Sequence, residues 1–189
     1  MIIRKAVYAD VESIATHLFL AMQEIVYGFI GEADSSKGIA FMLHFVEKEN
    51  NQYSYQNCWL VEEDRSVVAA VNIYDGARLQ ELRLPVIEYI RSRFNRDFDP
   101  EDETQAGEFY LDTLAVDPRR QGRGIGTHLL QFVINEFVTK QNKTLGLLVD
   151  ETNPSAKRLY VRLGFKLTGT RMLFGKRMEH LQIAGEENH

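Results

Sequence analysis

The sequence predicts an α/β (α+β) fold, a single domain in which a mixed, mainly antiparallel central sheet is flanked by helices. Three observations lead to this fold class. Apolar segments rich in β-branched residues alternate with amphipathic segments of helical period, and glycine, proline and acidic residues separate them. The 189 residues, 44% of them hydrophobic and 26% charged, have the balance of a globular domain that can bury a core.

The N-terminal third of the chain predicts one strand and two helices. Residues 2–7 are apolar enough to form the strand, and Asp10 can cap the helix that follows. An apolar stripe at helical spacing extends this helix over residues 11–27. Asp34 or Ser35 opens a second amphipathic helix.

The middle of the chain predicts a hairpin and then a less regular region. Residues 58–62 and 66–74 are strands on either side of a polar turn. After them, apolar residues recur at helical spacing around Pro85, which either starts a fresh helical run or kinks a longer helix. The acidic stretch 95–103 is interpreted as a solvated loop rather than as a lip that binds an acceptor.

The segment of residues 109–130 carries the most chemical information. Residues 109–116 alternate as a largely buried strand, and Asp117-Pro118 ends it because proline has no N–H group for a ladder. From Ile125 onward, apolar residues recur with the spacing of one helix face. We therefore expect a strand, a turn and a helix in close succession.

Three alternating glycines, Gly122, Gly124 and Gly126, stand where this helix begins, although glycine lowers helix propensity. Without side chains there, a diphosphate can contact the N–H groups of the first turn, where the helix dipole favours negative charge. Neighbouring arginines add positive charge: Arg119, Arg120 and Arg123. The pattern indicates a phosphate-bearing cofactor, and the alternative is a turn that merely lets the helix pack closely. A dinucleotide fold is disfavoured, since its fingerprint needs a glycine where Leu129 stands.

The C-terminal third predicts a strand, a short helix and the last strands. Residues 144–149 form the strand, and Asn153 or Ser155 caps the helix. Gly164 fits the position just beyond the C-terminus of that helix. Residues 166–170 and 172–178 are expected to be the last strands, either as a hairpin or as two pieces interrupted at Gly175.

Two segments together resemble the GNAT superfamily of N-acetyltransferases. The first, Leu114-Ala115-Val116-Asp117-Pro118 followed by Gln121-Gly122-Arg123-Gly124-Ile125-Gly126, is similar to the acetyl-CoA signature Gln/Arg-x-x-Gly-x-Gly/Ala. The second, residues 153–165, contains the family-like pattern Asn-x-x-Ala-x-x-x-Tyr. The resemblance implies a GNAT-like domain over residues 1–182 with a helical and acidic insertion near 77–107, followed by a flexible tail over 183–189.

The resemblance also implies that acetyl-CoA is the co-substrate. The backbone N–H groups of the glycine turn would bind its diphosphate, and the strand before the turn would present its backbone to the acetyl carbonyl and the pantetheine arm. Asn153 is assigned to a hydrogen bond with that arm. The cofactor-binding set is Leu114, Val116, Gln121, Gly122, Arg123, Gly124, Ile125, Gly126, Thr127 and Asn153.

Tyr160 matches the tyrosine of the family pattern and is the candidate acid for the leaving thiolate, because a phenol can hydrogen-bond or protonate it. The base is open. Asp112 is the tentative choice, since it shares a strand face with Leu114 and Val116. Water relays are a further route, and three other carboxylates are alternatives: Glu81, Glu88 and Glu108.

The composition indicates which binding partners and which cellular compartment to expect. A formal net charge of −5 does not favour nucleic acid. The single cysteine, Cys58, rules out an intramolecular disulfide and is expected to be a packing residue. The short charged N-terminus does not resemble a signal peptide, and no stretch of about 18 apolar residues predicts a membrane span. We expect a cytoplasmic protein without a metal site, because the five histidines lack zinc-type spacing.

Two functions remain open at this stage. The first is an acetyl-CoA-dependent N-acetyltransferase in which a primary amine of a small molecule or peptide attacks directly. The second is a non-catalytic acyl-CoA-binding sensor or partner protein. A homodimer is a further expectation, because exposed sheet edges in such domains often pair.

Overall fold

The computed structural model describes residues 1–185 and contains a sheet with the strand order β1-β2-β3-β4-β5-β7-β6. Its strands are β1 Ile2–Lys5, β2 Cys58–Glu63, β3 Ser66–Asp75, β4 Phe109–Val116, β5 Leu145–Asp150, β6 Lys166–Leu173 and β7 Lys176–Ile183. The β4–β5 pair is parallel, whereas the pairs β1–β2, β2–β3, β5–β7 and β6–β7 are antiparallel.

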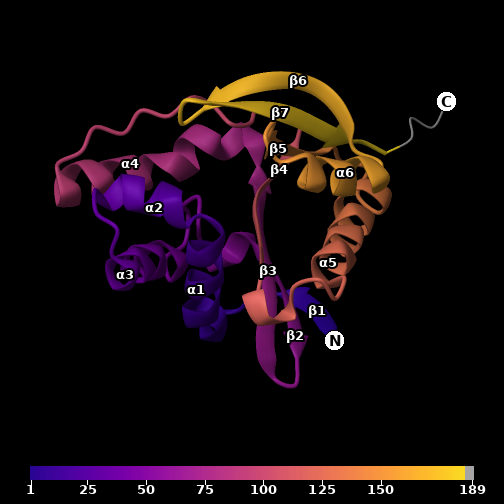
Figure 1. Ribbon diagram of the computed structural model, residues 1–189, viewed down its shortest axis with the longest axis horizontal. Helices are drawn as coiled ribbons and strands as arrows, with labels where there is room; N and C mark the ends of the chain where they lie inside the picture. The colour runs from indigo at the N-terminus through magenta and orange to yellow at the C-terminus, as the bar shows by residue number, and fades with distance from the viewer. Residues whose placement is uncertain (186–189) are drawn as a thin grey trace. The chain divides into compact units, whose positions relative to one another are not determined.

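Helices lie between these strands in the chain (Figure 1). The α-helices of the described residues are α1 Val11–Ala21, α2 Gln23–Ile30, α3 Ser35–Val46, α4 Leu79–Phe94, α5 Ile125–Ile134 and α6 Pro154–Arg162. Mixed strand directions and flanking helices confirm the predicted fold class.

The chain divides into two compact units. The first comprises Met1–Ile73, Gln80–Asp99 and Thr113–Leu129. The second comprises Tyr74–Leu79, Pro100–Asp112 and Leu130–His189, of which residues up to 185 are described. The predicted domain over residues 1–182 stays a prediction, because contact density alone does not define a folding domain.

An aromatic cluster forms part of the core of the first unit. The ring of Phe41, on α3, lies 5.7 Å from that of Phe29 on α2 and 5.0 Å from that of Phe45 one turn further along α3. Tyr89 of α4 adds a third ring at 6.0 Å. Because tilted and edge-to-face ring pairs add to the gain from burial, this cluster ties α2, α3 and α4 together.

The helix predicted over residues 11–27 is two helices, so that prediction is wrong. The chain bends by 95° at Met22, where the backbone leaves helical geometry (φ −127°, ψ 30°). The bend lets α2 bury Phe29 against Phe41 of α3. The continuous apolar stripe predicts one helix, but the packing of α2 against α3 favours a break between two helices.

Three local predictions have different outcomes. Asp34 caps α3, since its Oδ1 accepts a hydrogen bond from the Lys37 N–H at 3.0 Å. Asp10 precedes α1, but its carboxylate binds the Arg4 guanidinium at 2.7 and 2.9 Å instead of capping the helix. Pro85 lies inside an uninterrupted α4, so it starts no fresh helix.

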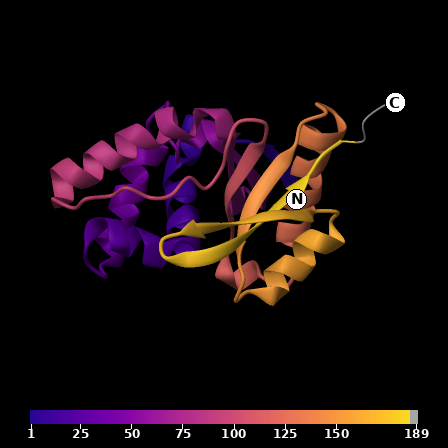
Figure 2. The same cartoon turned by 90° about the horizontal axis from the view of Figure 1, so that it is seen from above.

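The β6–β7 pair of the second unit is a hairpin, and both strands can be followed in yellow in Figure 2. It confirms the hairpin alternative for the last strands. β7 continues to Ile183, the first residue of the predicted tail. Residues 186–189 of that tail lie outside the described residues.

Within residues 1–185, no single helix combines the length and the apolar character needed to cross a membrane. The segments Tyr8–Ala21 and Gln23–Ile30 meet that test only as a pair, across their 95° bend.

Candidate active site

The turn between β4 and α5 is shaped by two glycines with left-handed backbone conformations. Gly122 has φ +76° and Gly124 has φ +78°, values that strain any L side chain. A Cβ atom at either position would meet nothing within 4 Å, so steric crowding is not the reason for glycine. The turn therefore presents bare backbone to its surroundings.

The first turn of α5 follows directly. The N–H groups at the start of a helix have no partner four residues earlier, and the helix dipole makes this end attractive to anions. Gly126 lies here against β4, because a Cβ on it would stand 3.4 Å from Val116 Cγ2 and 3.8 Å from Leu114 Cδ2. Ile125 is buried and Thr127 half-buried, which anchors the turn.

The arginines contribute less free charge than the sequence suggests. Arg119 pairs with Asp117 at 2.9 Å and Arg120 with Glu63 at 2.9 Å. The hydrogen bonds from the Arg119 guanidinium and N–H hold the pKa of Asp117 down at about 2, so this carboxylate is ionised at working pH. Arg123 is exposed beside the glycines.

A cavity of about 190 Å³ adjoins the turn within the first unit. Residues of β4 and the turn line it: Leu114, Ala115, Val116, Pro118 and Gln121. Gln121 Nε2 donates to the Val116 carbonyl at 3.3 Å. From α1, the lining residues are His17, Leu20 and Ala21. The structure thus brings four predicted site residues, Leu114, Val116, Gln121 and Gly126, together, and adds a histidine that the sequence patterns did not single out.

In the second unit, Asn153 and Tyr160 lie at the start and in the interior of α6. Asn153 Oδ1 accepts a hydrogen bond from the Ala156 N–H at 3.1 Å and caps the helix, as predicted. The Tyr160 ring packs edge-on against Phe165, with centroids 5.8 Å apart. Burial raises the pKa of the Tyr160 phenol, which is therefore protonated at neutral pH and able to donate.

Asp112, the tentative base, belongs to a buried cluster. The Tyr74 hydroxyl lies 3.1 Å from Asp112 Oδ2 and 2.8 Å from Glu103 Oε1. Burial and the two carboxylates raise the pKa of Tyr74 well above its usual value, so it acts as a proton donor. Glu103 is only 6% exposed, and the solvated surface predicted for residues 95–103 is therefore wrong at its last residue.

Glu108, an alternative base, is a structural residue of the second unit. Its carboxylate is fully buried and accepts hydrogen bonds from Thr104 Oγ1 at 2.6 Å and Gln182 Nε2 at 2.7 Å. His180 Nε2 lies 2.8 Å away. Burial alone raises the pKa of Glu108, but these hydrogen bonds outweigh it and hold the pKa below its usual value. Gly146 lies so close that any Cβ there would overlap the carboxylate.

We expect Glu108→Ala to lower the free energy of unfolding by about 3 kcal/mol, because the donors of Thr104 and Gln182 lose their buried acceptor. Glu136→Ala, which removes a half-buried helix pair with Lys140, is the control and should cost less than about 0.5 kcal/mol. Urea denaturation measures both. Equal stability of Glu108→Ala and the wild type would contradict the role of the cluster.

The same carboxylate predicts a pH dependence. Its folded pKa lies below the ordinary value of 4.5, so its contribution is complete above that value and disappears as pH falls through the folded pKa. Glu108→Gln should flatten the acid side of the stability curve. A wild-type curve with no loss between neutral pH and the acid range would contradict this.

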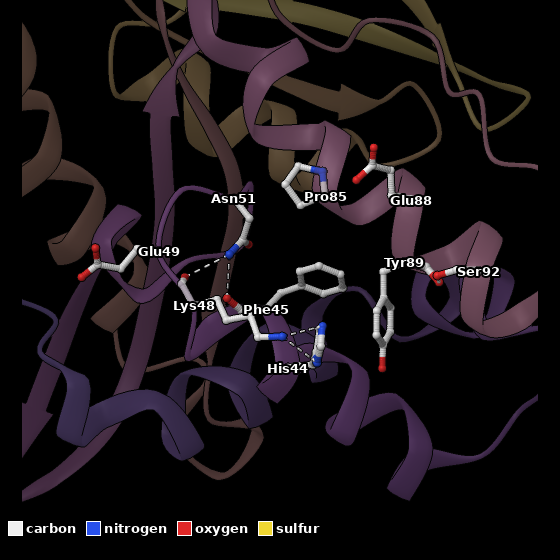
Figure 3. Close-up of a pocket in the computed structure, with 9 residues that line it drawn as sticks. All are labelled: His44, Phe45, Lys48, Glu49, Asn51, Pro85, Glu88, Tyr89 and Ser92. Carbon is white, nitrogen blue, oxygen red and sulfur yellow. Dashed lines mark hydrogen bonds between the residues drawn. The ribbon is translucent and has the colours of Figure 1, made fainter.

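Glu88, another alternative base, lines a separate cavity of about 390 Å³ (Figure 3). There the His44 ring stacks on Tyr89 at 4.0 Å, and Lys48 Nζ donates to His44 Nε2 at 2.9 Å. The lining residues come from α3, α4 and the segment after α3, and none belongs to β4 or the glycine turn. Glu81 is exposed on α4. In residues 1–185 no three metal-ligating side chains form a group that could hold a metal ion.

A strand, a glycine turn and a helix N-terminus beside a cavity form an arrangement that suits a phosphate-bearing ligand. The sequence matches the Acetyltransferase (GNAT) family over residues 31–165, and the chain belongs to this family. The resemblance to GNAT acetyltransferases that the sequence motifs indicated is thereby confirmed.

Curated relatives match only in part. The chain is 41% identical over 68 residues to a mycothiol acetyltransferase of Acidothermus cellulolyticus, a match that covers 36% of the chain and 20% of the relative. It is 33% identical over 70 residues to a spermine/spermidine N(1)-acetyltransferase of Bacillus subtilis, covering 36% and 46%. The chain thus spans less than half the length of these relatives.

Solved structures match over almost the whole chain. A crystal structure described as an acetyltransferase is 29% identical, covers 98% of this chain and 100% of its own, and has a TM-score of 0.81. A putative acetyltransferase from Salmonella typhimurium, solved with its cofactor acetyl-CoA, has a TM-score of 0.58 at 18% identity and covers 100% and 96%. At that identity the second match supports the fold alone.

Proposed function

We propose that this protein is an N-acetyltransferase that transfers the acetyl group of acetyl-CoA to a primary amine of a small molecule or peptide. The observation that carries the proposal is the bare turn at Gly122 and Gly124, which leads into the first turn of α5 beside the β4 cavity. The choice of a diphosphate-bearing co-substrate does not depend on the curated relatives, since the turn itself suits a diphosphate.

In this proposal, the N–H groups from Gln121 to Thr127 bind the diphosphate, with Arg123 beside them. The backbone of Leu114 and Val116 binds the pantetheine arm and polarises the acetyl carbonyl. The side-chain oxygen of Asn153 caps α6, so its amide N–H₂ is the group that donates a hydrogen bond to the pantetheine arm.

The reaction is a direct attack. The acceptor ammonium loses a proton to a base, for which Asp112 is the proposed residue, and the neutral nitrogen attacks the thioester carbon. As the tetrahedral intermediate collapses, the C–S bond breaks and Tyr160 gives a proton to the thiolate. The remaining extra proton of the attacking nitrogen then restores the Tyr160 phenol, so that amide and thiol are formed and the base holds one proton. Support for an amine acceptor comes from the spermine/spermidine relative.

Two measurements test the proposal. Calorimetric titration should detect acetyl-CoA binding, and a thiol-release assay with spermidine and with a peptide bearing a free α-amino group should detect transfer. Binding with amine-dependent thiol release supports the enzyme. Binding without release for a broad set of amines supports the sensor alternative, and no binding by folded protein would overturn both.

We also propose that the protein is cytoplasmic and forms a homodimer. The single cysteine, Cys58, is buried and is not in a disulfide, which suits a reducing compartment. β6 is the last strand in the sheet order and exposes Leu167 and Met172, which suits pairing with a second copy. Light scattering in solution tests the dimer, and a monomeric mass at all concentrations would overturn it.

A further inference from the structure

Residues 102–105 form a short segment before β4, and Arg171 of β6 holds this segment at both ends. Arg171 Nη1 donates a hydrogen bond to the Asp102 carbonyl at 3.2 Å, and Nη2 donates to Gln105 Oε1 at 2.7 Å. Arg171 and the segment both belong to the second unit. Because the N–H groups of a guanidinium have a fixed planar arrangement, two such hydrogen bonds set the position and the orientation of the segment.

The two residues between these contacts are buried, and both side chains are hydrogen-bonded. Glu103 is 6% exposed and Thr104 is 2% exposed. Glu103 Oε1 accepts a hydrogen bond from the Tyr74 hydroxyl at 2.8 Å. Thr104 Oγ1 donates to Glu108 Oε1 at 2.6 Å. Arg171 therefore holds the segment on either side of the residues that connect it to the rest of the second unit.

The packing around the segment restricts it further. Any Cβ atom at Gly76, just after β3, would overlap the Gln105 carbonyl oxygen. Arg171 Nε is buried and has no hydrogen-bond partner among residues 1–185. Because a buried N–H group without an acceptor costs free energy, the guanidinium makes its two contacts with the segment at the expense of its third N–H group.

Glu103 connects this segment to the proposed base. The Tyr74 hydroxyl that donates to Glu103 also lies 3.1 Å from Asp112 Oδ2. A phenol has one hydrogen to donate, and the shorter contact, to Glu103, is the stronger one. If Glu103 moved away, the hydrogen would go to Asp112 and stabilise its charged form, which would make Asp112 a weaker base.

We infer that Arg171 is a positioning residue of the proposed acetyl transfer, because it holds Glu103 on the Tyr74 hydroxyl and thereby keeps Asp112 able to accept a proton. The inference rests on the proposed function, in which the acceptor ammonium gives that proton to Asp112. Arg171 acts through Glu103 and Tyr74, and no bond forms or breaks at its own side chain.

The experiment compares Arg171→Met with Arg171→Lys and with Arg177→Met. Arg177, on β7, is the control, because it is exposed and pairs with Glu151 at 3.1 Å. We expect Arg171→Met to lower kcat by about 10-fold. Lysine can keep one of the two contacts and should give an intermediate kcat, whereas Arg177→Met should keep the wild-type value. Acetyl-CoA affinity, measured by calorimetry, should stay unchanged in all three variants.

A double-mutant cycle with Tyr74→Phe separates a positioning role from a structural one. Phenylalanine keeps the ring that packs against Tyr110, with centroids 5.7 Å apart, and removes the hydroxyl between Glu103 and Asp112. If Arg171 acts through that hydroxyl, Arg171→Met should cost less than about 2-fold in kcat when Tyr74 is already phenylalanine. A residue that only stabilises the fold would cause the same loss in both backgrounds.

A series of acceptor amines provides a second readout that a structural role would not change. An amine with a pKa near 10.4 depends on a base far more than one near 8, which is already about a tenth neutral at pH 7. The loss of kcat in Arg171→Met should therefore shrink as the pKa of the acceptor falls.

Three results would overturn the inference: wild-type kcat in Arg171→Met, an equal loss with and without the Tyr74 hydroxyl, or an equal loss for amines of every pKa. A wild-type protein that binds no acetyl-CoA, or that releases no thiol with any amine, would overturn the proposed function and this inference with it. The two failures are distinguishable, because each of the first three results requires an active wild type.

Discussion

Tyr160→Phe should lower kcat by about 10²- to 10⁴-fold and leave the affinity for acetyl-CoA nearly unchanged. The phenylalanine ring can keep the edge-on contact with Phe165, so the variant removes only the hydroxyl. Without that hydroxyl, the thiolate leaves unprotonated, and the collapse of the tetrahedral intermediate slows. Steady-state kinetics with a saturating amine, beside calorimetry of acetyl-CoA binding, measure the two effects separately.

Tyr55→Phe is the matched control, because its hydroxyl donates to Glu49 at 3.2 Å in an exposed contact of the first unit. It should keep wild-type kcat. A second test uses an acetyl thioester of an acidic aryl thiol, which needs no proton to depart. This donor should restore most of the activity of Tyr160→Phe, whereas an equally slow reaction would assign Tyr160 a packing role.

Burial also predicts the pH range over which Tyr160 works. Because its pKa is raised from the ordinary value of 10.0, the phenol remains protonated throughout the neutral range. Any basic limb from this group in the kcat profile should lie above pH 10.

The central segment could be predicted from the sequence because its signals are local. A proline after a strand, glycines before a helix and an asparagine before a proline each act within a few residues. β4 over Phe109–Val116, the start of α5 at Ile125 and the Asn153 cap all follow these rules. The reason for Gly122 and Gly124 was only partly visible, since their left-handed φ values are a property of the folded turn.

The contacts that surround the candidate base could not be predicted in this way. Tyr74 is separated from Glu103 by 29 residues and from Asp112 by 38. The hydrophobic periodicity of a sequence indicates which face of a helix or strand is buried. It does not indicate which side chains from distant parts of the chain contact that face. An acidic run is normally solvated, so no local signal distinguished Glu103 from its neighbours.

His17 shows the same limit at the proposed site. Its sequence position marks it as one polar residue in an amphipathic helix, and only the fold brings α1 beside β4 in the cavity that they share. The bend at Met22 was hidden for a similar reason. An apolar stripe runs through the break, and the burial of Phe29 against Phe41 is what favours it.

The largest expected loss of cofactor affinity comes from Gly124→Val. A β-branched residue at φ +78° is a strong conformational outlier, and its side chain would occupy the bare surface on which a diphosphate lies. The strain of about 1–2 kcal/mol should lower the stability of the variant. The lost backbone contacts should raise the Kd for acetyl-CoA at least about 100-fold. Calorimetric titration measures the change, and thermal unfolding measures the strain.

Gly175→Val is the control that separates the effect of backbone strain in Gly124→Val from the effect of lost contacts with the ligand. Gly175 lies in the β6–β7 turn with φ +71°, and a Cβ there would meet nothing within 4 Å, so the same substitution meets a similar backbone penalty. Both variants should lose comparable stability, and only Gly124→Val should lose affinity. Equal Kd values in the two variants would mean that the glycine turn holds no diphosphate, because the one difference between them is the surface that the new side chain covers.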